Sequence, residues 1–199
     1  MSRNSELAAA TLGHLAGLGV CHFVVCAGAR NAPLVTSLLA AEKVKSFKVW
    51  HHFDERTAAF FALGLSRGGS EPVAVLTTSG TAAAELLPAA IEGYYTSVPL
   101  VLVTADRPEW YRGSGAPQAI EQRGLFGVYT PLSIDVQRPE DLSWVIKWNR
   151  KVPMHLNVCF EEPRAVDCVT GFKTVVMPEP VAEDEGGIAE KIADFVRGR

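Results

Sequence analysis

The stretch VAVLTTSGTAAA, residues 73–84, decides the fold class. Its first part, Val73 to Thr78, is an apolar run typical of a strand that is buried on both faces. Ser79-Gly80-Thr81 has the composition of a tight turn, and the alanine-rich segment Ala82 to Tyr94 is predicted to be a helix. An apolar strand that leads through a short turn into a helix is the repeating unit of a parallel sheet.

The same order of strand, loop and helix occurs on both sides of this stretch. The predicted strands are His22 to Cys26, Phe47 to Phe53, Val73 to Thr78, Leu100 to Thr104, Leu132 to Val136 and His155 to Phe160. The predicted helices are Glu6 to Leu18 with Ser5 as its cap and Gly19 as its end, Leu34 to Ala41 after Pro33, Glu55 to Ser66, Ala82 to Tyr94, one around Ile120 to Phe126, and Glu140 to Asn149. This alternation predicts an α/β fold, a doubly wound and mostly parallel six-stranded sheet with helices on both faces.

The composition fits one globular domain and a tail. The chain has 199 residues, of which 48% are hydrophobic and 21% charged, and its net charge is -3. Neither sign of charge forms long blocks, so we expect no nucleic acid and no membrane surface as a partner. We assign residues 1–165 to one domain. Residues 166–199, with prolines, the acidic run Glu183 to Glu185 and a short amphipathic stretch from Ile188 to Val196, are predicted to be a linker and the start of a following domain that is absent.

The cysteines and the apolar runs indicate a cytoplasmic protein. The four cysteines form no CxxC pair, and most lie in or beside apolar runs, which favours reduced and structural thiols. The start of the chain lacks a basic region followed by an apolar stretch, so we expect no secretory signal. The longest apolar runs, such as Val98 to Val103, are far shorter than the roughly 20 residues that span a bilayer.

Candidate site residues follow the strands, because ligands of an open parallel sheet bind outside the carboxyl ends of its strands. Four loops qualify, and they are Gly28 to Pro33, Asp54 to Arg56, Ser79 to Thr81, and Thr104 to Pro108. Each loop alone also has a structural explanation, as a helix cap, a tight turn or a solvated surface arginine. His51 and His52 end a strand without a matching cluster of Cys or His, so no metal ligand is predicted in this chain.

In combination, these loops resemble a known family. Phe53-Asp54-Glu55-Arg56, Thr78-Ser79-Gly80-Thr81-Ala82 and Thr104-Ala105-Asp106-Arg107-Pro108, with the Gly-x-Arg-x-x-Pro loop before them, are similar to the amino-terminal domain of the MenD family. This family comprises the 2-succinyl-5-enolpyruvyl-6-hydroxy-3-cyclohexene-1-carboxylate synthases of menaquinone biosynthesis, which use thiamine diphosphate (thiamine pyrophosphate). Gly115 to Ile120 matches a further family segment, so the resemblance extends from about residue 7 to about Pro163.

The resemblance implies a role for each matching residue. Glu55 would bind the aminopyrimidine ring of the cofactor and promote the imino tautomer that takes the C2 proton, as the catalytic residue. Ser79, Gly80 and Thr81 would also bind the cofactor. The family decarboxylates 2-oxoglutarate and adds the succinyl unit to isochorismate, and both substrates carry carboxylates. The implied substrate-binding residues are Arg30, Asn31, Arg107 and Gln118.

Some expected residues differ or are missing. Ala29 and Asn31 stand where the family has serines, so hydroxyl contacts are not expected there, and Pro117 replaces an asparagine. The chain contains no Gly-Asp-Gly segment, so the site for Mg²⁺ and the diphosphate is expected in a missing domain. That domain would belong to another subunit of a homodimer or homotetramer, and the isolated chain is predicted to be inactive. Alternatives are another thiamine diphosphate decarboxylase, an acetohydroxyacid synthase, or a non-catalytic binding domain of the same fold.

Overall fold

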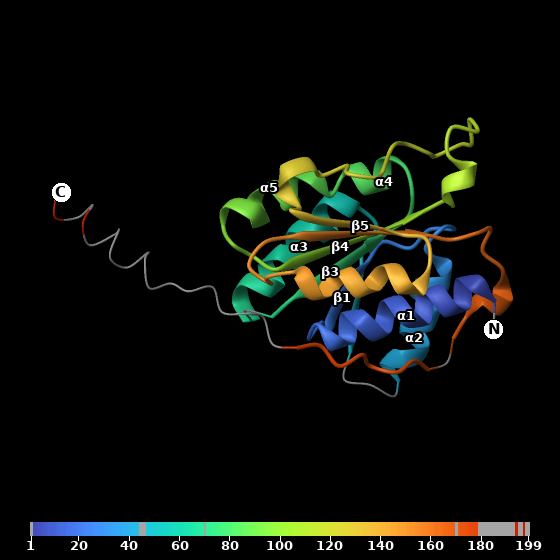
Figure 1. Cartoon of the computed structure of the whole chain (residues 1–199), viewed down its shortest axis with the longest axis horizontal. Helices are drawn as coiled ribbons and strands as arrows, with labels where there is room; N and C mark the ends of the chain where they lie inside the picture. The colour runs from blue at the N-terminus through green and yellow to red at the C-terminus, as the bar shows by residue number, and fades with distance from the viewer. Residues whose placement is uncertain are drawn as a thin grey trace.

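The protein folds around a six-stranded parallel sheet in a computed structural model (Figure 1). The structure describes residues 2–43, 47–69, 71–169 and 171–178, together with positions 194 and 197. Within these residues all neighbouring strands are parallel, and they lie in the order β2-β1-β3-β4-β6-β5. The strands are β1 (His22–Val25), β2 (Lys48–His51), β3 (Val73–Thr77), β4 (Leu100–Asp106), β5 (Leu132–Val136) and β6 (Met154–Cys159). The predicted doubly wound sheet is confirmed.

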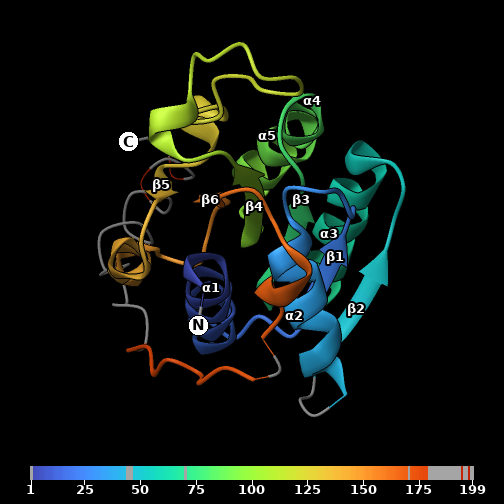
Figure 2. The same ribbon diagram turned by 90° about the vertical axis from the view of Figure 1, so that its right-hand side faces the viewer.

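Helices cover both faces of the sheet, as Figure 2 shows. On one face lie α1 (Arg3–Gly17), α2 (Ala32–Glu42) and the 3-10 helix η3 (Pro139–Lys147). On the other lie α3 (Glu55–Gly69), α4 (Thr81–Ala84) and α5 (Leu87–Tyr95). Each face has its own buried apolar cluster, because every central strand presents apolar side chains to both sides. Short 3-10 turns are η1 (Glu109–Tyr111), η2 (Gly127–Tyr129) and η4 (Ala165–Asp167).

The prediction of one continuous helix from Ala82 to Tyr94 is wrong. The segment forms two helices, because α4 ends at Ala84 and α5 begins at Leu87. Pro88 lies in the first turn of α5 and has no N–H to donate to the carbonyl of Ala84. A proline fits the start of a helix but interrupts its interior, so the sequence contained the signal for this break.

The predicted helix around Ile120 to Phe126 is also absent. This segment forms loops and turns, and Gly124 and Gly127 adopt left-handed backbone conformations with φ of 71° and 51°. Right-handed helical residues need negative φ, so Gly124 interrupts a helix within this segment, and Gly127 begins the separate short turn η2. The predicted helix from Glu140 to Asn149 is present as the 3-10 helix η3.

The first helix begins earlier than predicted. Ser2 is its N-cap, and the Ser2 hydroxyl accepts a hydrogen bond from the backbone N–H of Ser5. Ser5, the predicted cap, therefore lies inside the helix as the donor. Gly19 follows the helix with a φ of 86°, which agrees with its predicted role in ending it.

Residues 171–178 form a strap that crosses α1. The backbone N–H of Val175 donates to the carbonyl of Gly13 at 3.0 Å. A Cβ atom at Gly13 would lie 2.4 Å from the carbonyl oxygen of Lys173, and one at Gly17 would overlap the carbonyl oxygen of Val175. The strap thus depends on two glycines spaced one helical turn apart. The division at residue 165 stays a prediction, and the stretches Glu183 to Glu185 and Ile188 to Val196 fall outside the described ranges.

Two further observations concern the chain as a whole. All four cysteines are free, with Cys26 and Cys159 buried, Cys21 partly buried and Cys168 exposed. Among the helices of the described residues, none is both long and apolar enough to cross a lipid bilayer.

Candidate active site at the carboxyl ends of the strands

The four candidate loops meet at one edge of the sheet, because the strands that carry them are parallel. The strand order changes direction between β1 and β3, which is where sheets of this type bind ligands. The loops after these two strands touch. A Cβ atom on Gly28 would lie 2.6 Å from Cβ of Thr78, so only glycine allows this close approach.

Glu55 is the first residue of α3, and its half-buried side chain lines a pocket of about 350 Å³. The walls are formed by Val25 to Ala27 at the end of β1 and by His51, His52 and Phe53 at the end of β2. These walls are largely apolar, and the volume lies in the range of small-molecule pockets. Glu55 therefore presents a carboxylate to a cavity that suits a single heteroaromatic ring.

The capping role at the start of α3 belongs to Asp54. The backbone N–H of Thr57 donates to Oδ1 of Asp54 at 2.7 Å, and hydrogen bonding with the side chain and the backbone of Thr57 lowers the pKa of Asp54. Within the described residues, the carboxylate of Glu55 forms no hydrogen bond and no ion pair. The structural explanation for this acidic pair thus applies to Asp54 and leaves Glu55 available to a ligand.

Cys26 and Phe53 contribute uncharged side chains to the wall of the Glu55 pocket. Burial, followed by the charges of Glu55 and Asp54, raises the pKa of the Cys26 thiol to about 12. Cys26 is therefore a neutral thiol at physiological pH, and it forms an apolar wall beside the carboxylate. Phe53 is fully exposed, with a relative exposure of 106%. Phe53 thus adds an exposed apolar rim to the pocket.

The turn of Ser79, Gly80 and Thr81 is covered by the segment around Gln118. The carboxamide of Gln118 donates to the carbonyl oxygen of Ser79 at 3.0 Å, and the Ser79 hydroxyl donates to the carbonyl oxygen of Gln118 at 3.1 Å. Gly80 has a φ of 81°, and a Cβ atom there would lie 2.8 Å from the Gln118 carbonyl oxygen. Ser79 and Gly80 are consequently buried, whereas Thr81 is exposed.

Arg107 lies at the centre of the same cluster. Its guanidinium donates to the carbonyl oxygens of Pro117 and Gln118, at 2.8 Å and 3.2 Å, and approaches the Ser79 hydroxyl at 3.4 Å. These contacts hold down the loop that projects from the end of β4 in Figure 1. The structure thereby brings together four of the predicted site residues, Ser79, Gly80, Arg107 and Gln118.

Arg30 and Arg107 line one pocket of about 470 Å³, together with the aromatic residues Trp110 and Tyr111. Arg30 forms an ion pair of 2.8 Å with Glu162, which lies at the same pocket. The two arginines implied by the resemblance, which come from different loops, thus converge on one cavity. It joins cationic groups to an apolar aromatic wall, which suits a carboxylate with a carbon skeleton.

Asn31, although next to Arg30, has a different position. Its side chain is fully buried, and Oδ1 accepts a hydrogen bond from the backbone N–H of Gly28 at 2.8 Å. Its Nδ2 donates to the carbonyl oxygen of Cys26 at 2.9 Å. The side chain of Asn31 shapes the loop from within, so its predicted direct contact with substrate has no support in this geometry.

Sequence reasoning missed a polar network at the ends of β4, β5 and β6. Arg112 donates two hydrogen bonds to Asp135, at 2.7 Å and 2.9 Å, and one to Asp106 at 3.2 Å. Burial raises the pKa of Asp135, but hydrogen bonds, with that from Arg112 the strongest, hold it at about 2. Asp106, Asp135 and Cys159 have the spacing of metal ligands. The Nη2 atom of Arg112 contacts all three, so its guanidinium supplies the positive charge of this cluster.

Gln122 extends this network to the site loops. Its side chain accepts a hydrogen bond from the backbone N–H of Gly80 at 2.8 Å, and donates to the carbonyl of Ala105 and to Oδ1 of Asn157. Gln122 is buried, although glutamine is normally exposed. The loop that carries Arg107 is therefore held at both ends, by Arg112 and by Gln122. A signal in the sequence was available, because Asp135 and Asn157 are polar residues within predicted buried strands.

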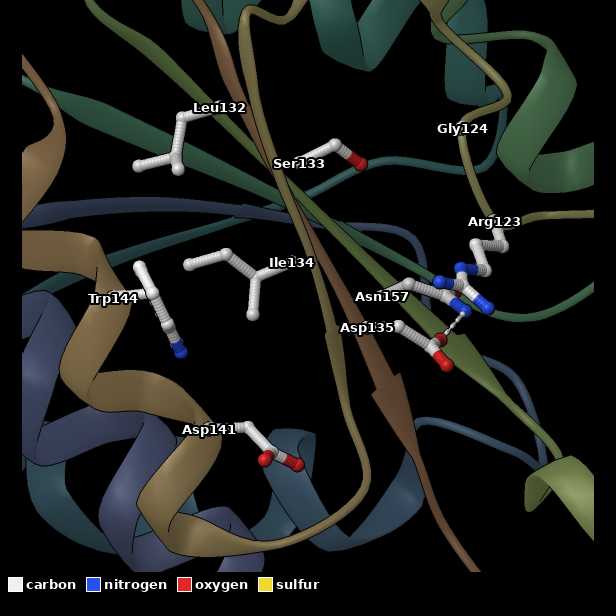
Figure 3. Close-up of a pocket in the computed structure, with 9 residues that line it drawn as sticks. All are labelled: Arg123, Gly124, Leu132, Ser133, Ile134, Asp135, Asp141, Trp144 and Asn157. Atoms are coloured by element: carbon white, nitrogen blue, oxygen red, sulfur yellow. Dashed lines mark hydrogen bonds between the residues drawn. The ribbon is translucent and has the colours of Figure 1, made fainter.

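A separate hollow of about 460 Å³ lies beside the edge strand β5 (Figure 3). Leu132, Ile134 and Trp144 line one part of it, and Asp135 and Asn157 form a hydrogen bond of 2.8 Å at another part. None of the predicted site residues lines this hollow. Because Asp135 and Asn157 line it, the hollow borders the polar network.

The residues of the Glu55 pocket fit the pyrimidine half of thiamine diphosphate. The unpartnered carboxylate of Glu55 can share a proton with a ring nitrogen, and the pocket around it combines the apolar side chains of Val25, Ala27 and Phe53 with the neutral Cys26 and the imidazoles of His51 and His52. No second acidic side chain lines this pocket in the described part of the chain, so the donor set lacks the oxygen ligands that Mg²⁺ prefers. The pocket suits the ring and not the metal-bound diphosphate.

Comparisons with known proteins agree with this geometry. The model of the family described as thiamine pyrophosphate enzyme, N-terminal TPP binding domain, matches residues 5–125. A 2-succinyl-5-enolpyruvyl-6-hydroxy-3-cyclohexene-1-carboxylate synthase of Bdellovibrio bacteriovorus is 52% identical over 166 residues, which cover 80% of this chain and 30% of the relative. The synthases of the same name from Akkermansia muciniphila and Chloroflexus aurantiacus are 56% and 44% identical, over 73% and 77% of this chain and 27% and 28% of those relatives. The chain thus spans about 30% of the length of these curated relatives.

Proposed function

The chain belongs to the thiamine pyrophosphate enzymes, as their N-terminal TPP binding domain, and we propose that it forms the amino-terminal region of a 2-succinyl-5-enolpyruvyl-6-hydroxy-3-cyclohexene-1-carboxylate synthase. The whole enzyme would be a transferase of menaquinone biosynthesis. It would decarboxylate 2-oxoglutarate and add the succinyl unit to isochorismate. The observation that carries this proposal is the unpartnered carboxylate of Glu55, which faces a ligand-sized pocket at the switch point of the sheet.

Glu55 would hold the cofactor by its aminopyrimidine ring. When bound, thiamine diphosphate supplies a carbanion at C2 of its thiazolium ring. Glu55 would share a proton with the ring nitrogen and so favour the imino tautomer of the neighbouring amino group. The position supports this role, since the carboxylate reaches the pocket from a helix start whose capping is already done by Asp54. Ser79, Gly80 and Thr81 would line the cofactor site, and Thr81 is the exposed residue of the three.

Arg30 and Arg107 would bind the carboxylates of the substrates. Both guanidinium groups line the 470 Å³ pocket and donate to backbone carbonyls, and Arg30 also pairs with the carboxylate of Glu162. Among the described residues no carboxylate pairs with Arg107, so its positive charge would be available to an anionic ligand. Gln118 would orient a polar group of the bound substrate, and Asn31 would act by shaping the loop of Arg30.

Several further properties belong to the same proposal. Mg²⁺ and the diphosphate would be bound by a second domain of another subunit, in a homodimer or homotetramer in the cytoplasm. The exposed Phe53 and the 44% exposed Phe60 on α3 support contact with such a domain. The isolated chain would be inactive and bind the cofactor weakly, because most of the affinity comes from the diphosphate and its metal ion.

The relatives favour this function over the alternative of an acetohydroxyacid synthase or another 2-oxo acid decarboxylase. A non-catalytic binding domain is the remaining alternative. The test is to incubate the full-length protein with thiamine diphosphate, Mg²⁺, 2-oxoglutarate and isochorismate and to identify the product by mass spectrometry. The expected product carries a succinyl unit on the cyclohexene ring. A protein that turns over pyruvate but leaves 2-oxoglutarate unchanged would reject the proposal, and the absence of any turnover would favour a binding domain.

A further inference from the structure

The contacts of Arg30 divide into a backbone side and a side-chain side. Nη1 donates to the carbonyl oxygens of Phe160 and Glu161, at 3.4 Å and 3.1 Å. Nη2 donates to Oε2 of Glu162 at 2.8 Å. The backbone contacts therefore fix the guanidinium whether or not Glu162 is present, whereas the carboxylate of Glu162 takes up a donor that an incoming ligand could use.

The two partners of this ion pair differ in their exposure. The side chain of Arg30 is 10% exposed, and that of Glu162 is 82% exposed. Glu162 loses little when it turns into water, because its carboxylate is already largely hydrated. Arg30 would lose its counter-ion in a nearly buried position, which is unfavourable. The pair should therefore open readily only when another anion takes the place of Glu162.

We propose that Glu162 is a specificity-determining residue, an internal carboxylate that occupies Arg30 until the carboxylate of a substrate replaces it. This inference rests on the proposed function, because it takes the ligand of the pocket to be a carboxylate. A neutral ligand cannot make the exchange, since it would leave Arg30 without a counter-ion. Glu162 therefore selects for anionic ligands in the pocket that Arg30 shares with Arg107 and Trp110.

The chain offers a matched control next to Glu162. Glu161 borders the same pocket and carries the same charge, but its carboxylate pairs with Arg3 at 2.9 Å. Glu161→Gln and Glu162→Gln each remove one negative charge from this region and keep the size of the side chain. Only the second substitution frees the guanidinium of Arg30, so the difference between the two variants isolates the exchange from the general change in electrostatic potential.

The experiment compares these two variants with the wild type in the full-length protein. Calorimetric titration with succinate, a simple dicarboxylate, measures the affinity of the pocket without requiring turnover. Glu162→Gln should bind succinate about twofold to fivefold more tightly, the range expected when an exposed ion pair no longer competes. Glu161→Gln should gain distinctly less. For whichever substrate contacts Arg30, isochorismate or 2-oxoglutarate, the Michaelis constant should fall by a similar factor in Glu162→Gln.

The gain should depend on Arg30. In an Arg30→Ala background, Glu162→Gln should leave the affinity for succinate unchanged, which completes a double-mutant cycle. Weaker succinate binding in Glu162→Gln would overturn the proposal, because it would show that Glu162 orients Arg30. An equal gain in both single variants would also overturn it. A wild-type enzyme that does not turn over 2-oxoglutarate would reject the proposed function instead, and the succinate titration would still decide the role of Glu162.

Discussion

Glu55 and Arg107 both lie at the carboxyl edge of the sheet, but their surroundings differ. The carboxylate of Glu55 faces its pocket without a hydrogen bond to the described residues. The guanidinium of Arg107 already binds two backbone carbonyls, and its loop is anchored by Arg112 and Gln122. The comparison indicates that the half of the site around Glu55 depends on its ligand for completion, whereas the half around Arg107 is built in advance.

The sharpest test of this comparison is Glu55→Gln in the full-length enzyme. Glutamine keeps the shape of the side chain but cannot exchange a proton with the cofactor ring. We expect kcat to fall about 100-fold or more, the usual range for loss of an acid–base group. Steady-state kinetics measure this loss, and calorimetry should find cofactor affinity within a few-fold of wild type. Near-normal turnover of Glu55→Gln would show that Glu55 is not required for catalysis.

Arg107→Ala should have the next largest effect and should act on substrates. It removes a charge-assisted contact worth about 1.5 to 3 kcal/mol, which corresponds to a roughly tenfold to hundredfold rise in KM. Arg30→Ala should do the same for the carboxylate that it contacts. Saturation curves for both substrates provide the measurement. Unchanged curves in both variants would indicate that the two arginines have only a structural role. Loss of cofactor affinity would indicate that the Glu55 half and the Arg107 half of the site are not independent.

Protonation of Asp135 at low pH should lower the stability of the protein around the Arg107 half of the site. In the folded protein its pKa is about 2, below the ordinary value of 3.8, because hydrogen bonds favour the charged form. The stability gained in this way is complete above about pH 4 and is lost as the pH falls toward 2, a loss of about 2 kcal/mol. Urea denaturation of the 199-residue chain at several pH values would measure it. Asp135→Asn should lack this part of the pH dependence, and an unaltered profile would contradict the assignment.

Gly80→Ala should produce a smaller effect confined to the same half. A side chain at this positive φ would meet the backbone of Gln118, so we expect a loss of about 1 to 2 kcal/mol in unfolding free energy. Gly64, within α3, has open space around its α-carbon, and Gly64→Ala serves as the control that should stabilise the chain by up to about 1 kcal/mol. Thermal denaturation compares the two variants. Equal stability of both would mean that the Gln118 loop can move away at no cost.

The sequence predicted the sheet well and the loops less well. Continuous apolar runs such as Val73 to Thr78 identify buried parallel strands, because burial on both faces leaves little room for polar side chains. The pattern could also place Glu55 and Arg107 at one edge, since each follows such a strand. It could not show which partners these groups meet. Those contacts come from residues distant in the sequence, such as Pro117 with Arg107, and no local periodicity reports them.

The strap over α1 has a consequence for the order in which this chain can fold. The glycine groove of α1 is synthesised before the six strands, whereas the segment that fills it is synthesised after β6. During translation, α1 can therefore dock on the emerging sheet while its outer groove stays uncovered. Closing the strap is a contact between distant parts of the sequence, which is a slow kind of step. We expect it among the last events of folding, as the step that joins α1 to the segment after β6.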